Sequence, residues 1–266
     1  LREFFDADLA RRLVADGKRA DLIVANNVMA HTPTLNSFVE GLSILLADDG
    51  VVTIENTYVK DLIDHCEFDT IYHEHLCYFS LTALDALFRR HGLFLNDFRR
   101  LPIHGGSLRL FCCHQASGHE EVQALRDLRA TEAAAGLNRG ETYDGFTARV
   151  EAVRDSFLAF VATARDDGKA IAAYGAAAKG NTFLNYCGVT AADIVCAFDA
   201  NPAKQDRHLP GSRIPIFAPA KVAEIRPDYV LILPWNLRDE IAAQLAGVRA
   251  WGGRLVVPIP EMEVLP

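Results

Sequence analysis

The sequence has no excess of basic charge and no long apolar run, which excludes two broad classes of function. Its 266 residues carry 27 Lys and Arg against 35 Asp and Glu, for a formal net charge of −8. Binding to nucleic acid without sequence preference needs a basic face, so we expect no nucleic-acid partner. No apolar stretch approaches the roughly 20 residues of a membrane-spanning helix, so we expect no membrane partner either. The length and the 50% of hydrophobic residues fit one large globular domain or two ordinary ones.

Cysteine is sparse and never occurs in the Cys-x-x-Cys spacing of metal-binding or redox-active pairs. The six cysteines are Cys66, Cys77, Cys112, Cys113, Cys187 and Cys196. Disulfide frameworks belong mainly to short secreted chains that are dense in cysteine. We therefore expect buried thiols that act as small hydrophobes, in a protein of the reducing cytoplasm.

Apolar spacing in the first part of the chain predicts helices that alternate with strands. Asp6 is placed to cap a helix that ends at Gly17. The next elements are a buried parallel strand at residues 21–26, a helix at 35–46 that residues 48–50 end, and a strand at 51–55. This order is a βαβ unit, whose crossover should be right-handed. The polar and aromatic residues 56–79 follow where open α/β sheets place their ligands.

The rest of the chain predicts a sheet edge, two linking helices and a second α/β region. Ser80 is placed to cap a helix that Gly92 closes, and two strand-like runs after it suggest an antiparallel hairpin, at residues 93–98 and 107–113. Two helices fill residues 118–167, and strands follow at 170–174, 194–198, 229–233 and 254–257. The predicted fold class is α/β, with a partial Rossmann-type domain, a helical bridge and a smaller Rossmann-like domain at residues 1–116, 117–168 and 169–266.

Four consecutive residues have ionisable or hydrogen-bonding side chains: Tyr72, His73, Glu74 and His75. An imidazole is a suitable general base, because its pKa lies near neutrality. A carboxylate beside it could orient the imidazole or hold a hydroxyl group of a ligand. The same spacing also fits half of a metal site, which His31 and His104 could complete, or a plain polar loop. Local chemistry leaves these three alternatives open.

Four segments together resemble signatures of the S-adenosylmethionine-dependent sugar C-methyltransferases, which act on nucleotide-linked keto deoxy sugars. They are residues 68–80, with the Tyr-His-Glu-His run, and residues 104–109, 174–182 and 233–236. The segments occur in the family's order, and the similarity covers essentially the whole chain. It implies that residues 1–116 are the C-terminal part of a Rossmann-type methyltransferase domain. It also implies methyl transfer to a ring carbon, C-3 as the best guess, of a dTDP-linked 4-keto sugar.

The resemblance implies roles for individual residues of the reaction centre. His75 is implied as the base that removes the proton beside the ketone, with His31 the other candidate for that role. Glu74 is implied to contact the sugar, and Tyr72 to lie by the reacting centre. The residues implied to touch S-adenosylmethionine are Asn26, Asn27 and Val28. By themselves these three also fit a strand-to-helix loop with a helix-capping asparagine.

Two glycine-containing segments are candidates for the nucleotide diphosphate. The first is His104, Gly105, Gly106 and Ser107, whose backbone N–H groups suit a diphosphate or a sugar hydroxyl but also fit a hairpin turn. Arg109 in the strand after it could pair with a phosphate or with a core carboxylate. The second segment is implied by the resemblance to bind the nucleotide through Lys179, Asn181 and Thr182. Its glycines would equally serve close packing of a strand against a helix.

Residues 175–180 also approach the dinucleotide-binding fingerprint, with Asp199 about 20 residues further on. Ala177 stands where the middle glycine is required, and its Cβ would crowd a pyrophosphate. An NAD-dependent oxidoreductase is therefore one alternative function. A non-catalytic module that binds a nucleotide sugar is another.

Two parts of the family pattern have no counterpart in residues 1–20. They are the glycine-rich turn with its following acidic residue, and a zinc-binding cysteine cluster. We therefore expect a chain that starts inside the methyltransferase domain. Zinc is then expected only in the part that precedes it, and the pocket for S-adenosylmethionine should be incomplete. We expect no metal ion in the chain itself.

Overall fold

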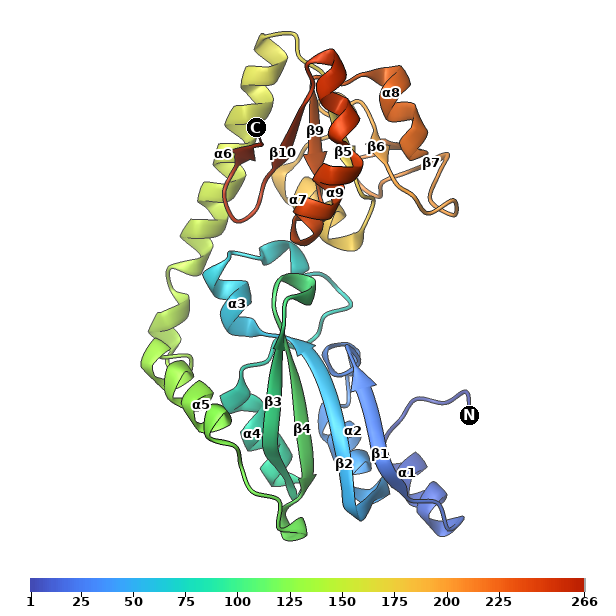
Figure 1. Ribbon diagram of the computed structural model, residues 1–266, viewed down its shortest axis with the longest axis vertical. Coiled ribbons are helices and arrows are strands. Elements are labelled where there is room, and N and C mark those ends of the chain that lie inside the picture. The colour runs from blue at the N-terminus through green and yellow to red at the C-terminus, as the bar shows by residue number, and fades with distance from the viewer. Residues whose placement is uncertain (266) are drawn as a thin grey trace. The chain divides into compact units, whose positions relative to one another are not determined.

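A computed structural model describes residues 1–265, and the chain divides into two compact units (Figure 1). The first unit is formed by Leu1–Leu62 and His73–Asp144, and the second by Ile63–Tyr72 and the chain from Gly145 on. The predicted helical bridge, residues 117–168, is divided between them. Its first helix, α5 (Gln123–Ala135), belongs to the first unit, and its second, α6 (Phe146–Asp166), to the other.

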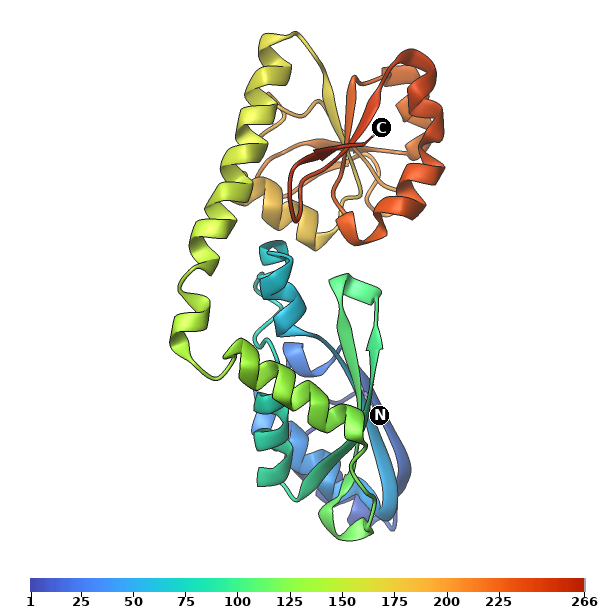
Figure 2. The same cartoon turned by 60° about the vertical axis from the view of Figure 1, so that its left-hand side comes forward.

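The first unit has a four-stranded sheet in the order β1-β2-β4-β3. The strands are β1 (Ala20–Asn26), β2 (Leu46–Thr57), β3 (Leu93–Leu101) and β4 (Ser107–His114). β1 and β2 are parallel, and β4 is antiparallel to both β2 and β3, so the predicted parallel pair and the hairpin are confirmed. The helices are α1 (Ala7–Ala15), α2 (Leu35–Leu45), α3 (Val59–Asp64), α4 (Leu81–Arg90) and α5. Figure 2 shows α2, α4 and α5 on the same side of this sheet.

Two details of the first strands differ from the prediction. β1 is not buried, because it lies at the edge of the sheet and its alternate side chains Leu22 and Val24 are 62% and 58% exposed. Asp48, Asp49 and Gly50 do not end the preceding helix, because β2 already begins at Leu46, whose side chain is fully buried. The turn-forming residue types of this stretch are overridden by pairing of Leu46 with Ala20 of β1.

The second unit is a sheet in the order β11-β10-β9-β5-β6-β8-β7, whose inner neighbours pair in parallel. Its strands are β5 (Ile171–Tyr174), β6 (Ala197–Phe198), β7 (Arg207–His208), β8 (Pro215–Phe217), β9 (Tyr229–Ile232), β10 (Arg254–Val257) and β11 (Glu263–Val264). Its helices are α6, α7 (Ala178–Cys187), α8 (Val222–Ile225) and α9 (Arg238–Gln244). The predicted smaller Rossmann-like domain is present, with antiparallel strands added at both edges.

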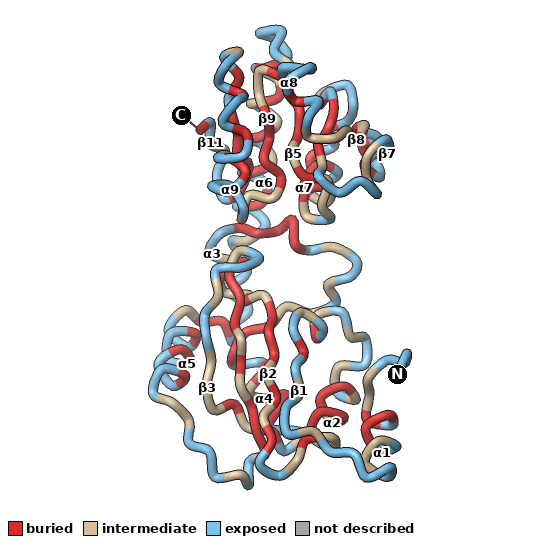
Figure 3. The backbone as a smooth tube through the Cα atoms, turned by 45° about the vertical axis from the view of Figure 1, so that its right-hand side comes forward, coloured by how far each residue is buried: buried red, intermediate tan, exposed pale blue. Residues whose placement is uncertain are grey.

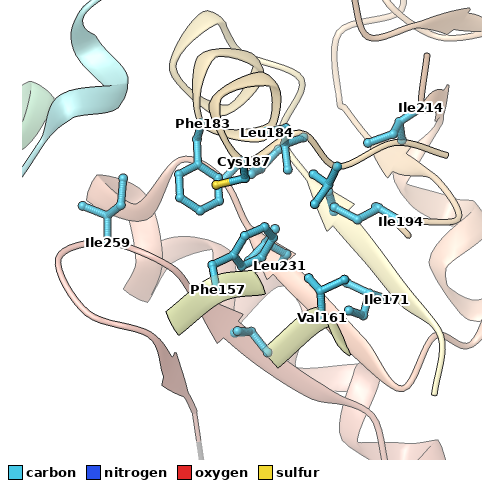
Figure 4. Packing of buried hydrophobic residues seen from close by; sticks show 14 of the residues in the cluster. Phe157, Val161, Ile171, Phe183, Leu184, Cys187, Ile194, Ile214, Leu231 and Ile259 are labelled. Atoms are coloured by element: carbon cyan, nitrogen blue, oxygen red, sulfur yellow. The ribbon is translucent and has the colours of Figure 1, made fainter. Parts of the chain in front are cut away.

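Helices cover both faces of this second sheet, and its strand residues alternate between two cores. On β9, Leu231 packs into the cluster of Phe157 and Phe183, which α6 and α7 contribute (Figure 4). Its neighbour Val230 packs into a separate cluster that includes Ile241 of α9. Side chains of successive strand residues point to opposite faces, so a strand buried on both sides is apolar throughout.

The segment Ile63–Tyr72 departs from the predicted domain order. It follows β2 in the chain, but Cys66 and Phe68 join the core cluster of the second unit. The rings of Phe68 and Phe183 lie 6.0 Å apart. Figure 3 shows the tube in the buried colour through residues 66–70. The chain therefore enters the second unit before the Tyr-His-Glu-His run and returns to the first unit at His73.

The six cysteines are free thiols, and all but Cys77 are buried. This agrees with the expectation of thiols in the core. Within residues 1–265, none of the helices is both long enough and apolar enough to cross a membrane.

Candidate active site

Several loops of the first unit are held together where β1 and β2 end. The backbone N–H of Asn27 donates to Glu55 O at 2.7 Å, and that of Leu76 donates to Ala30 O at 2.8 Å. Two further backbone bonds of 3.0 Å join Tyr58 to Gly106 and Val59 to Phe79. The carboxyl ends of parallel strands are where sheets of this kind bind ligands. The loop after β1, the chain after β2, the His75 segment and the β3–β4 turn thus meet at that edge.

His31 and His75 are brought together at this edge. Their ring centroids are 5.0 Å apart, with an angle of 60° between the ring planes. The bond from Leu76 to Ala30 accounts for the contact, since each histidine neighbours one of the bonded residues. The ring of Tyr78 lies 6.4 Å from that of His75. Two imidazoles therefore lie side by side at this edge, that of His75 half-buried and that of His31 exposed.

The other predicted members of the reaction centre are placed differently. Glu74 and His73 are exposed, and their side chains approach each other to 3.9 Å between Oε1 and Nε2. Tyr72 is the last residue of the segment that belongs to the second unit. Across residues 1–265 no three His, Cys, Asp or Glu side chains are grouped so that they could hold a metal ion.

Asn27 is fixed by the sheet rather than by a helix. Its φ of 54° lies in the left-handed region, which asparagine tolerates better than most residues. Its side-chain amide donates to Oε1 of Glu55 at 3.1 Å, and the helical turn Met29–His31 begins without a side-chain cap. The helix-capping alternative is therefore wrong. Asn26 and Val28 on either side are exposed.

Arg109 pairs with the same buried glutamate. Its Nη2 and Nε donate to Oε2 of Glu55 at 2.6 and 3.1 Å, from a position directly across the β2–β4 pair. Glu55 is 3% exposed, so its charge needs these partners. The sequence allowed Arg109 to pair with a phosphate or with a core carboxylate. In the structure it pairs with a core carboxylate, that of Glu55. Glu55, which the sequence pattern does not mark, thereby links Arg109 to Asn27.

The glycine turn between β3 and β4 is shaped by Asp61, a buried carboxyl that pairs with the exposed Arg100. A Cβ on Gly106 would lie 2.1 Å from Oδ2 of Asp61, and the φ of Gly106 is +139°, so only glycine fits. Asp61 accepts from Nη2 of Arg100 at 2.6 Å. Ser107 closes the turn by donating to Ile103 O at 3.2 Å. These contacts account for the hairpin, and they involve Asp61 and Arg100, which no local motif identifies.

Lys179 and Thr182 on α7 have partners within the second unit. The hydroxyl of Thr182 donates to Ala178 O at 3.0 Å, one helical turn earlier. Nζ of Lys179 lies 4.8 Å from the ring centroid of Trp235. Its charge also acts on the buried carboxyls of Glu67 and Asp69. Burial raises the pKa of Glu67 to about 7, against the opposing effects of Lys179 and His65.

The fingerprint-like segment 175–180 serves packing. A Cβ on Gly175 would lie 2.5 Å from Cγ of Pro234, and one on Gly180 would lie 2.7 Å from Cβ of Leu233. Asp199 accepts from the backbone N–H groups of Ala176 and Asn201 at 2.7 and 2.8 Å, and pairs with Lys204. The oxidoreductase alternative requires Asp199 free to hold a ribose. Both oxygens already accept hydrogen bonds within the second unit, which counts against that alternative.

The sequence matches the models of two protein families. A family described as "C-methyltransferase C-terminal domain" matches residues 102–260, and one described as "Methyltransferase domain" matches residues 3–95. The chain belongs to the C-methyltransferase family. The C-methyltransferase NovU of Streptomyces niveus is 38% identical over 261 residues, which are 98% of this chain and 62% of NovU. The chain thus spans less than two thirds of the length of that relative.

Solved methyltransferase structures are only weakly similar to this chain. TnmH is 21% identical over 37% of this chain and 31% of its own, with a TM-score of 0.31. An O-methyltransferase family protein from Burkholderia thailandensis is 15% identical over 40% of this chain and 33% of its own, with a TM-score of 0.30. Likeness of this degree bears on neither the fold nor the site.

Proposed function

We propose that the protein to which this chain belongs transfers the methyl group of S-adenosylmethionine to a ring carbon of a nucleotide-linked 4-keto deoxy sugar. C-3 of a dTDP-linked sugar is the substrate position that we propose. Membership of the C-methyltransferase family supports methyl transfer to carbon. The free thiols fit a cytoplasmic enzyme.

The observation that carries this proposal is the pairing of His31 with His75 at 5.0 Å. A carbon beside a ketone becomes nucleophilic only when its proton is removed. In our proposal His75 takes that proton, and the C–H electron pair forms the enolate. The bond to the methyl group then forms from the enolate as the sulfur–methyl bond breaks. His31 packs against the ring of His75 and is the other candidate for the base. A positioned base contributes roughly 10²- to 10⁴-fold.

The residues at the end of β1 fit one side of a bound methyl donor. Asn26 and Val28 are exposed there, while Asn27 is held by Glu55 and keeps the loop in place. When bound, the donor supplies an electrophilic methyl group. The same edge carries His104, Gly105, Gly106 and Ser107, which we propose for the sugar diphosphate. Lys179, Asn181 and Thr182 remain our candidates for the nucleotide, with Lys179 also balancing buried acids.

The test uses the full-length protein, methyl-labelled S-adenosylmethionine and a series of keto-sugar nucleotides. We compare wild type with His75→Gln, His31→Gln and, as a matched control, His119→Gln, which changes an exposed histidine of the same unit. We expect turnover to fall roughly 10²- to 10⁴-fold in His75→Gln and to stay unchanged in His119→Gln. Unchanged turnover in His75→Gln would reject its role as the base.

A second measurement separates proton removal from methyl transfer. In D₂O without methyl donor, wild type should exchange the proton beside the sugar ketone, and His75→Gln should not. Loss of exchange in His31→Gln alone would move the role of base to His31. A protein that binds the nucleotide sugar but neither exchanges nor methylates it would be a non-catalytic binding module instead.

A further inference from the structure

The run Tyr72–His75 begins in one unit and ends in the other. The chain leaves the first unit after Leu62, lies in the second unit as far as Tyr72, and returns at His73. Within that excursion Phe68 packs against Phe183 and against Tyr186, with ring centroids 6.0 and 5.1 Å apart. A loop that only linked two elements of one sheet would stay at the surface. This segment is instead built into the core of the second unit.

A buried polar contact holds the same segment. Asp69 is 1% exposed, and its Oδ2 accepts a 2.8 Å hydrogen bond from Nε1 of Trp235, which is 166 residues away in the sequence. Lys179 lies over the indole ring of Trp235. Burial raises the pKa of Asp69, while Lys179 and the indole N–H oppose that effect. An apolar side chain would pack as well, but a hydrogen-bonded carboxyl group also sets the orientation of the backbone that carries it.

The other end of the run has its own attachment. The N–H of Leu76, the residue after His75, donates to Ala30 O in the first unit. That bond keeps His75 beside His31. Asp69 lies three residues before Tyr72 and Leu76 one residue after His75, so the run is tied on both sides at short range.

We infer that Asp69, held by Trp235, is a positioning residue that fixes the Tyr72 end of the Tyr72–His75 run. Neither residue need touch substrate for this role. The effect of Asp69 on catalysis rests on the proposed function, since the position of the run affects the rate only if residues of the run take part in methyl transfer. Misplacement of a reacting group by about 1 Å costs on the order of 10²-fold in rate.

The first test measures backbone hydrogen exchange and needs no substrate. In Trp235→Phe the ring remains but the N–H donor is lost. The matched control is Trp251→Phe, because the indole of Trp251 also donates within the second unit, to Pro227 O at 3.0 Å. Loss of the donor leaves a buried acceptor without its partner, which should raise exchange at residues 68–72 roughly tenfold or more. We expect β9 to keep its protection in both variants, and residues 68–72 to keep theirs in Trp251→Phe.

Two exchange results would overturn the inference. Unchanged exchange at residues 68–72 in Trp235→Phe would mean that the bond does not hold the segment. An equal rise in β9 and in the segment would mean that the bond stabilises the whole unit and does not position one part of it.

The second test measures methyl transfer by the full-length protein. We expect kcat to fall at least tenfold in Trp235→Phe, with KM for sugar and donor within about twofold, and both to be unchanged in Trp251→Phe. A rise in KM alone, or an unchanged kcat, would contradict positioning of the run. If wild type transfers no methyl group, the proposed function fails, whereas the exchange experiment still decides whether Asp69 anchors the segment.

Discussion

Glu67 should make the stability of the second unit fall as pH rises. Its side chain is fully buried, and Oε1 lies 3.3 Å from Nδ1 of His65. Burial raises its pKa from 4.5 to about 7, while Lys179 and His65 act in the opposite direction and Asp69 in the same one. The folded chain therefore holds this proton more tightly than the unfolded chain. The resulting stabilisation is fully present below about pH 4.5 and is lost as pH rises to about 7.

The size of the effect follows from the two pKa values. At about 1.4 kcal/mol for each pH unit between 4.5 and 7, the loss amounts to ~3 kcal/mol. Glu67→Gln removes the ionisable group and keeps its shape. The free energy of unfolding of this variant, relative to wild type, should therefore rise by roughly 2–3 kcal/mol between pH 5 and pH 8. Asp69 is present in both proteins, so most of the difference comes from Glu67.

Urea denaturation followed by circular dichroism, at half-unit steps from pH 5 to pH 8, measures this difference. Glu151→Gln on α6 is the matched control, because Glu151 is an exposed glutamate of the same unit. Its profile should run parallel to wild type. Parallel profiles for Glu67→Gln and wild type would refute the reasoning, since they would mean that folding does not desolvate the carboxyl. A variant that lost stability relative to wild type at pH 8 would mean that the ion pairs outweigh burial.

Two further substitutions test the packing of the two units. Arg109→Met leaves the buried carboxylate of Glu55 without its cation, and should lower the free energy of unfolding by about 2 kcal/mol, less than the 3–5 kcal/mol of a fully buried pair because Arg109 is 36% exposed. The double variant with Glu55→Gln should recover most of that loss in urea denaturation, and a single variant as stable as wild type would contradict the account. Gly175→Ala should cost about 2–4 kcal/mol by thermal denaturation with no nucleotide present, because its Cβ would meet Pro234 at a φ of +90°. Gly168→Ala, at a φ of +65° with open space around it, should cost only about 1 kcal/mol, and equal losses at both glycines would argue against the clash.

Local features of the fold could be predicted because their causes are local. Asp6 and Ser80 accept hydrogen bonds from backbone groups three residues later, so the helix starts are encoded within one turn. The start of α4 also shows the limit of this reasoning. Both oxygens of Glu132 accept from Leu81 and Thr82, some 50 residues earlier, and no local pattern marks that contact.

In the candidate site, too, some residues could be predicted from the sequence, while the contacts that hold them could not. His31 and His75 could be named from the sequence because a strand end and a family-like motif mark them, and the structure brings their rings together. Asn27 could be named as a site residue from the sequence. What holds its side chain could not be predicted, because its partner Glu55 lies on the neighbouring strand. The sequence did not decide whether the glycines of residues 175–180 serve nucleotide binding or packing. The close approach of Pro234 and Leu233, which are distant in the sequence, explains them by packing.

The sequence by itself determined the α/β class, most of the elements and the family, since periodicity, caps and motifs act over a few residues. Only the tertiary structure decided that Ile63–Tyr72 belongs to the second unit and that buried Glu67 and Asp69 lie there near Lys179 and Trp235. Such contacts join residues more than a hundred positions apart. Their strength comes from burial and from low dielectric surroundings, which exist only once the chain has folded.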